Sequence, residues 1–213
     1  MVYKDRQDAG RKLAESLTKY IDEEPVIIAL PRGGVVIGYE VAKKLHAPLD
    51  IIVARKIGAP FQPELGVGAI AQNGIRIINS ETIRLLGVTE PQIEQIIKWE
   101  TSEMDRRISL YRKGLPSLNL HGKTVIVVDD GLATGISTRA AVRSVKQMHP
   151  KKIILAVPVC PHDSAEKFRQ EVDDFFCLNE PADFYAVGSH YADFKQVTDE
   201  EVIDIMQMAK HIT

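Results

Sequence analysis

One short segment, residues 125–138, constrains the fold of this chain more than any other. Val125 to Val128 are four consecutive β-branched residues, a pattern typical of a strand that is buried on both faces. Asp129 and Asp130 follow at once, and a helical pattern begins near Thr138. A buried strand that leads directly into a helix is the building unit of a parallel sheet. The segment therefore predicts an α/β protein with this strand in the centre of its sheet.

The same segment also indicates a ligand. In open parallel sheets, ligands bind just beyond the carboxyl ends of the strands, where Asp129 and Asp130 are expected. A turn of small and hydroxyl residues opens the next helix, and unpaired N–H groups at a helix N-terminus favour phosphate. Carboxylates accept hydrogen bonds from hydroxyl groups. We infer a ligand that carries both a diol and a phosphate monoester, such as ribose 5-phosphate.

Strand and helix patterns alternate along the rest of the chain. Strands are expected at residues 26–30, 49–54, 152–159, 174–178 and 184–187, and helices at 5–21, 35–45, 89–113, 163–170 and 198–210. Asn73 and Gly74 predict a β-hairpin that joins residues 66–71 and 75–78. Strands that alternate with helices favour a parallel central sheet with helices on both faces.

Composition narrows the class of protein. A length of 213 residues suits a single domain, 1–213, and the 45% hydrophobic content argues against disorder. A formal net charge of −2 argues against nucleic acid as a partner, although this net charge does not exclude a local basic patch. The N-terminus lacks a signal-peptide pattern and no apolar run has membrane-spanning length, so we expect a cytoplasmic protein without a membrane partner.

The two cysteines are expected to be buried free thiols. Cys160 and Cys177 lie in apolar, strand-like surroundings, and neither belongs to a Cys-x-x-Cys pair. This context favours free thiols over a disulfide or a metal site.

Residues 125–138 resemble the 5-phosphoribosyl 1-diphosphate (PRPP) motif of the type I phosphoribosyltransferases. That motif consists of a hydrophobic strand, two acids, three variable positions, then Thr-Gly and a hydroxyl residue. The resemblance extends over about residues 24–195 and implies that Asp129 and Asp130 bind the ribose hydroxyls as catalytic residues. It assigns the 5-phosphate to the following loop, which comprises Ala133, Thr134, Gly135, Ile136, Ser137 and Thr138.

Two other segments resemble the pyrophosphate-binding parts of the same family. Arg32, Gly33 and Gly34 follow the first strand, in the place of a loop that in this family often contains a strained non-proline peptide. Arg55 and Lys56 are expected at the end of the second strand, where the resemblance favours both as pyrophosphate contacts and Lys56 as catalytic. Without the resemblance, these segments would be interpreted as a tight turn and a pair of solvated charges.

Residues 57–116 occupy the place of the flexible catalytic loop of the family, and residues 179–197 that of the hood that covers the acceptor. The long charged helix within 57–116 could direct arginines toward pyrophosphate, but ion pairs with Glu100 and Glu103 on the same helix are the simpler interpretation. In the hood, Phe184, Tyr185 and Val187 are candidate acceptor contacts.

The resemblance implies transfer of a phosphoribosyl group from PRPP to a nitrogen acceptor, with release of pyrophosphate. A nucleobase-like ring is the expected acceptor, and a homodimer is the expected assembly. Mg²⁺ would be held by substrate oxygens and water near Asp129 and Asp130, without direct protein ligands. Enzymes for 6-oxopurines carry an Asp where this chain has Ala133, so the sequence names no acceptor base. Two alternatives remain open: a non-catalytic regulator that senses PRPP or nucleotides, and a hydrolase or mutase acting on another sugar phosphate.

Overall fold

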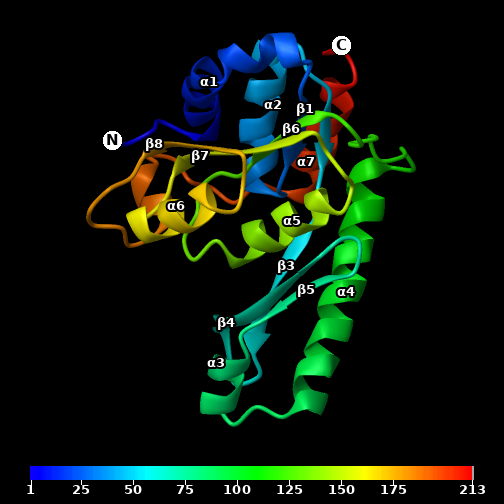
Figure 1. Cartoon of the computed structure of the whole chain (residues 1–213), viewed down its shortest axis with the longest axis vertical. Helices are drawn as coiled ribbons and strands as arrows, with labels where there is room; N and C mark the ends of the chain where they lie inside the picture. Colours follow the sequence, from blue (N-terminus) through cyan, green and yellow to red (C-terminus); the bar gives the residue numbers. More distant parts are fainter. Residues whose placement is uncertain (213) are drawn as a thin grey trace.

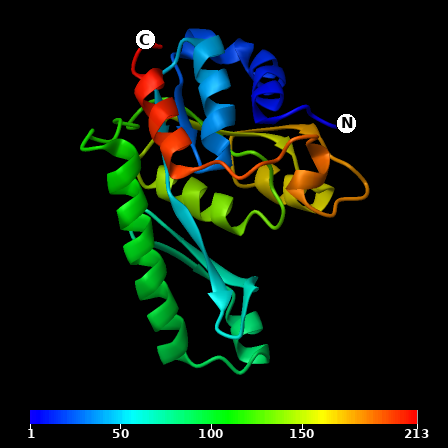
Figure 2. The same cartoon turned by 180° about the vertical axis from the view of Figure 1, so that it is seen from behind.

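The computed structural model describes residues 1–212, apart from the side chain of Glu64. Its centre is a parallel sheet of five strands in the order β2-β1-β6-β7-β8. These strands are β1 (Val26–Ala29), β2 (Leu49–Ile51), β6 (Thr124–Val128), β7 (Lys152–Val159) and β8 (Asp174–Asn179). Helices α1 (Arg6–Ser16), α2 (Gly33–Leu45) and α7 (Asp199–Ala209) cover one face, and α5 (Ile136–Lys146) and α6 (His162–Arg169) cover the other (Figure 1, Figure 2). The predicted α/β fold is confirmed.

Burial on both faces explains the unbroken apolar pattern of the central strand. Successive residues of a strand point to opposite faces of the sheet. In β6, Ile126 and Val128 belong to the core that contains α1, α2 and α7, whereas Val125 and Val127 belong to the core beneath α5 and α6. All four side chains are fully buried.

A second unit extends from one end of the sheet as an arm (Figure 1). It consists of an antiparallel sheet of β3 (Ala54–Ala59), β4 (Gln62–Ala71) and β5 (Ile75–Ile78), followed by α3 (Ser80–Leu85) and α4 (Glu90–Arg112). The predicted hairpin at Asn73 and Gly74 and the long helix are confirmed. The predicted insertion, 57–116, overlaps this arm, which begins at Ala54 and whose last helix ends at Arg112.

The arm is packed on both sides. Buried residues of α4, such as Ile93 and Ile97, share a core with Ile57 of β3 and with the main body. On the other side, Ala69 and Ala71 of β4 pack against Ala140 of α5. In the described part of the chain, no helix is both long and apolar enough to cross a membrane.

Three details of the expected secondary structure were wrong. The strand expected at 49–54 ends at Ile51, and the chain enters the arm sheet at Ala54. The helix expected at 5–21 ends at Ser16 and continues as a 3-10 helix, Thr18–Glu23. Residues 184–187 form no strand: Val187 begins a 3-10 helix, Val187–His190, and Phe184 stacks on His190 at the end of that helix.

Because Ile126 is fully buried at the centre of the sheet, Ile126→Ala should lower the free energy of unfolding by about 3 kcal/mol. Leu85→Ala is the matched control, since this α3 side chain is 76% exposed and its loss should cost less than about 0.5 kcal/mol. Urea denaturation of both variants measures the difference. Equal losses would contradict the placement of Ile126 in the core.

Candidate functional site

The loops that follow β1 and β6 meet at the carboxyl edge of the sheet, because these strands are parallel neighbours. A Cβ atom on Gly33 would lie 1.9 Å from Oδ2 of Asp130, and one on Gly34 would lie 2.9 Å from the carbonyl oxygen of Val128. Only glycine fits this closely against the acids. The peptide bond between Pro31 and Arg32 in the same loop is cis.

Asp129 is partly buried and is held by two hydrogen bonds. The backbone N–H of Asp130 donates to its Oδ1 at 2.8 Å, and the hydroxyl of Thr138 donates to its Oδ2 at 3.1 Å. Burial raises the pKa of Asp129 well above its ordinary value, and the neighbouring carboxylate of Asp130 raises it further. Two adjacent, partly buried acids therefore disfavour the fully ionised state.

Arg6 contacts the second acid, although sequence reasoning missed it. Its Nε lies 2.7 Å from Oδ2 of Asp130, and its Nη1 donates to the carbonyl oxygen of Lys195 at 2.7 Å. Its guanidinium also lies 3.9 Å from the centre of the Phe194 ring. Burial raises the pKa of Asp130, and the charge of Arg6 opposes that rise. No sequence signal marks Arg6, because a cation in the first turn of an amphipathic helix is normally solvated.

The loop assigned to phosphate forms one compact turn before α5. Gly135 is the N-cap of α5 with a φ of 69°, and a Cβ atom there would lie 2.6 Å from the ring of Phe168. The hydroxyl of Ser164 donates to the carbonyl oxygen of Ala133 at 2.8 Å and holds the turn from the side of α6. The N–H groups of the first helical turn, from Ile136 onward, have no partner within the helix. The structure thus brings the six predicted residues together at one helix N-terminus.

Arg32 lies in the loop beside the acids, and its guanidinium faces α7. Its Nη1 lies 3.6 Å from Oδ1 of Asp199, the first residue of that helix. The same carboxylate accepts a hydrogen bond from the hydroxyl of Tyr111 at 2.6 Å. This hydrogen bond lowers the pKa of Asp199, and the charge of Arg32 lowers it further. Arg32, in the loop after β1, therefore faces the same carboxylate as Tyr111 in the long helix of the arm.

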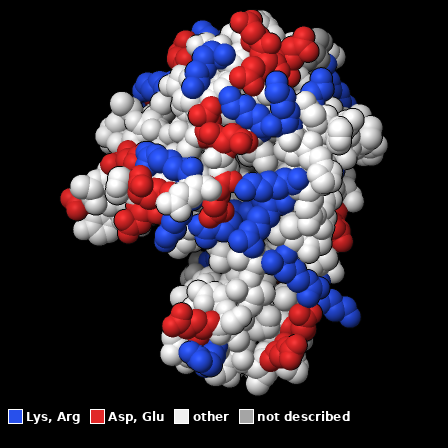
Figure 3. Space-filling view, in the orientation of Figure 1, with Lys and Arg blue, Asp and Glu red and all other residues white. Residues whose placement is uncertain are grey.

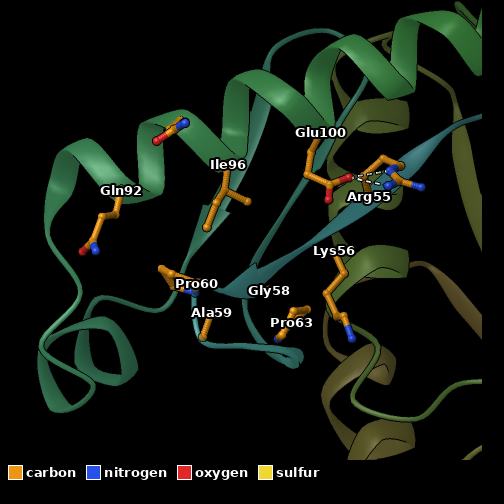
Figure 4. A pocket seen from close by; sticks show the side chains of 10 residues that line it. Arg55, Lys56, Gly58, Ala59, Pro60, Pro63, Gln92, Ile96 and Glu100 are labelled. Carbon is orange, nitrogen blue, oxygen red and sulfur yellow. Dashed lines mark hydrogen bonds and ion pairs between the residues drawn. The ribbon is translucent and has the colours of Figure 1, made fainter.

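The expected position of Arg55 and Lys56 was wrong, because both lie inside β3 of the arm and not at the end of β2. They extend to opposite sides of the strand: Arg55 turns toward Glu100 on α4, whereas Lys56 points away from α4 (Figure 4). Arg55 forms an ion pair with Glu100, with Nε 2.6 Å from Oε2. A contact between Arg55 and pyrophosphate would have to break this pair.

A cavity of about 580 Å³ lies between β3 and α4 (Figure 4), and neither of the two acids lines it. Its lining combines apolar residues with the side-chain amides of two glutamines and with the ion pair of Arg55 and Glu100. The lining residues are Arg55, Lys56, Gly58, Ala59, Pro60, Pro63, Gln92, Gln95, Ile96 and Glu100.

The charged helix of the arm uses most of its arginines structurally. Arg106 and Arg107 both pair with Glu103, at 2.7 and 2.8 Å, which confirms the expected ion pairs along the helix for Glu103. For Glu100 the expectation was wrong, because its partner is Arg55 on β3. Arg112 instead forms two hydrogen bonds of 3.2 Å to the buried carboxylate of Asp50 at the edge of the main sheet. These contacts join α4 to the body of the protein.

The three candidate acceptor residues lie in different surroundings. Val187 lies beside the loop after the acids, since a Cβ atom on Gly131 would be 2.5 Å from its Cγ1. Phe184 is partly buried and stacks on His190 with ring centres 5.5 Å apart. Tyr185 is 91% exposed. Val187 therefore adjoins the loop after the acids, whereas the side chain of Tyr185 is exposed to solvent.

Two electrostatic features bear on ligands. Among residues 1–212, no group of three or more His, Cys, Asp or Glu side chains could hold a metal ion. Lys and Arg side chains gather over α5 in Figure 3, where the helix carries Arg139, Arg143 and Lys146. The net charge of −2 therefore coexists with a local positive region.

Comparison with known proteins identifies relatives over almost the whole chain. A family model described as the phosphoribosyl transferase domain matches residues 3–194. Two relatives from Mycobacterium tuberculosis, MT0597 of strain CDC 1551 and Rv0571c of strain H37Rv, are provisionally named phosphoribosyl transferases. Each is 39% identical over 208 residues, which cover 98% of this chain and 47% of the relative. The chain thus spans about half the length of these relatives.

Solved structures with the same fold include TT1426 from Thermus thermophilus. It is 37% identical, with a TM-score of 0.81, over 98% of this chain and 99% of that one. A protein from Neisseria gonorrhoeae solved with bound ppGpp covers 98% of both chains with a TM-score of 0.53. At 13% identity, the latter likeness concerns the fold alone.

Burial of the two acids should make Asp129→Asn more stable than the wild type at pH 7. Because the pKa of Asp129 is raised, its contribution to wild-type stability is most favourable below the ordinary Asp value of about 3.9 and is lost as the pH rises through the folded-state pKa. The Asn variant has no carboxyl group at this position and so does not lose this stability. Each unit by which the pKa of Asp129 is raised corresponds to about 1.4 kcal/mol of unfolding free energy. Its advantage in unfolding free energy should therefore shrink between pH 7 and pH 4.

Chemical denaturation at several pH values measures this dependence. Asp183→Asn serves as the control, because this exposed hood residue should leave the pH profile of stability as in the wild type. A variant that is less stable than the wild type at pH 7 would show that the hydrogen bonds to Asp129 outweigh its burial.

Proposed function

This chain belongs to the phosphoribosyl transferase family, and on that premise we propose that it transfers a 5-phosphoribosyl group from PRPP to a nitrogen acceptor and releases pyrophosphate. One observation carries the proposal. The glycine loop after β1 lies directly against Asp129 and Asp130, and these acids lead into the turn that opens α5. Sites for pyrophosphate, ribose and 5-phosphate would then adjoin one another in the order that PRPP requires.

Each part of the donor has a proposed partner. The 5-phosphate binds the turn from Ala133 to Thr138 through backbone N–H groups and hydroxyls. Asp129 and Asp130 accept hydrogen bonds from the ribose hydroxyls, each worth about 1.5–3 kcal/mol as a bond to a charged group. Arg32, Gly33, Gly34 and Lys56 stabilise the departing pyrophosphate. Positive charge develops at the anomeric carbon, so catalysis depends on positioning and electrostatics.

We propose that Mg²⁺ accompanies the donor. Mg²⁺ in nucleotide enzymes is often bound by one or two carboxylates together with substrate phosphates and water, and Asp129 and Asp130 offer that donor set. When bound, Mg²⁺ would neutralise charge on the pyrophosphate. The two carboxylates would hold it through water and substrate oxygens.

The acceptor is proposed to be a nucleobase-like ring, held between the site and the hood, residues 179–197. Val187 would contact it, while Phe184 and Tyr185 are candidates for stacking once the hood closes. Ala133 supplies no carboxylate for proton transfer, so the proposal names no base. A cytoplasmic homodimer belongs to the same proposal. The side chain of Trp99 on α4 is 70% exposed, and this apolar surface favours the dimer.

PRPP titration in the presence of Mg²⁺ tests donor binding. Wild-type protein should bind saturably, and the double variant Asp129→Asn, Asp130→Asn should bind at least about 100-fold more weakly, because two charge-assisted hydrogen bonds are lost. Isothermal calorimetry measures both affinities, and removal of Mg²⁺ with a chelator should abolish wild-type binding. Asp183→Asn should bind as the wild type does.

Pyrophosphate release across a panel of nitrogen bases then separates the candidate functions. A transferase releases pyrophosphate with its acceptor, and a sensor binds PRPP but releases none. A hydrolase or mutase of other sugar phosphates does not bind PRPP. Absence of PRPP binding by the wild type would therefore overturn both the transferase and a sensor of PRPP.

Because the side chains of Arg55 and Lys56 point to opposite sides of β3, their substitution should have different effects on the enzyme. Lys56→Met should lower kcat for pyrophosphate release by about 100-fold, the scale on which a charge-stabilising donor is lost. Arg55→Met should retain most of the turnover and instead loosen the arm, because it breaks the ion pair with Glu100. Steady-state kinetics and protease sensitivity of the arm distinguish the two. Equal losses of turnover would show that Arg55 also reaches the pyrophosphate.

A further inference from the structure

The two cysteines of this chain lie in contact in the structure. Cys160 follows directly after β7, and Cys177 lies within the neighbouring strand β8. Their Sγ atoms are 2.9 Å apart, and both are free thiols. The sequence contains two cysteines in all, so the fold places its whole complement of thiols together.

The two thiols differ in access. Cys160 is fully buried, and both its hydrogen bond to Cys177 and its burial raise its pKa. Cys177 is partly exposed, and its thiol donates to the carbonyl oxygen of Asn179 at 3.1 Å. A small oxidant from solvent would thus reach Cys177 first, with Cys160 in place behind it as the resolving thiol.

We propose that Cys160 and Cys177 form a reversible dithiol–disulfide site that is oxidised by peroxides. In the first step, Cys177 Sγ attacks a peroxide oxygen of hydrogen peroxide, the O–O bond breaks, and a sulfenic acid and one water form. In the second step, the Cys160 thiol gives up its proton, its Sγ attacks Cys177 Sγ, and the S–O bond breaks to release a second water. Two thiols and one peroxide yield one disulfide and two waters.

The site is connected to the loop after the two acids. The carbonyl oxygen of Val159, next to Cys160, accepts a hydrogen bond from the N–H of Leu132 at 2.9 Å. The N–H of Cys160 itself donates to the carbonyl oxygen of Asn179 at 3.2 Å, at the start of the segment 179–197. A cross-link at Cys160 therefore restrains the backbone that supports the loop, and it should slow hydrogen exchange at the Leu132 amide.

Intact mass spectrometry of the folded protein after one equivalent of hydrogen peroxide tests the proposal. The mass of the wild type should fall by about 2 Da, because disulfide formation removes two hydrogen atoms. Reduction with dithiothreitol should return the protein to its original mass. Cys160→Ala should instead gain oxygen at Cys177, because the sulfenic acid has no resolving partner. Cys177→Ala should remain unmodified over the same time, because its remaining thiol is buried.

Thiol counting on the wild type, by alkylation under denaturing conditions before and after oxidation, needs no variant and should fall from two to none. Wild-type protein that gains oxygen without forming the cross-link would overturn the disulfide. Hydrogen exchange of the oxidised protein is the second measurement. A disulfide that leaves exchange at Leu132 unchanged would overturn the link to the loop.

Discussion

The close contact between the loop after β1 and the two acids after β6 is the constraint on which the rest of the site depends. Gly33 leaves no room for a side chain beside Asp130, and Gly34 packs onto the backbone at the end of β6. Parallel pairing of β1 with β6 brings these loops to one edge, and the fully buried strands hold them there. The geometry of the site is thus a direct consequence of the core of the sheet.

This arrangement has an electrostatic cost, because two neighbouring carboxylates are partly buried together. Arg6 compensates for part of it through its contact with Asp130, and Thr138 compensates through its hydrogen bond to Asp129. Arg6 also contacts Phe194 and the backbone of Lys195, so the cation that balances the acids connects them to the segment 179–197. Sites that hold unfavourable charge in the free protein commonly trade stability for ligand binding.

The arm is coupled to the site by the same kind of contact. Asp199 at the N-terminus of α7 accepts a hydrogen bond from Tyr111 of the arm helix and faces Arg32 of the loop after β1. On the opposite side, β4 packs against α5, the helix that follows the turn proposed to bind phosphate. Movement of the arm would therefore reach the proposed donor site through both α7 and α5.

The sequence by itself determined the fold class, the positions of most strands and helices, and the two loops of the site. These depend on local periodicity and on residue types such as Gly33, Asp129 and Gly135, whose roles follow from the strand and helix beside them. Only the tertiary structure decided that Arg6 meets Asp130, that Arg55 turns to Glu100, and that the two cysteines touch. The first two contacts join residues 124 and 45 positions apart, and in all three the sequence pattern carries no trace of the partner.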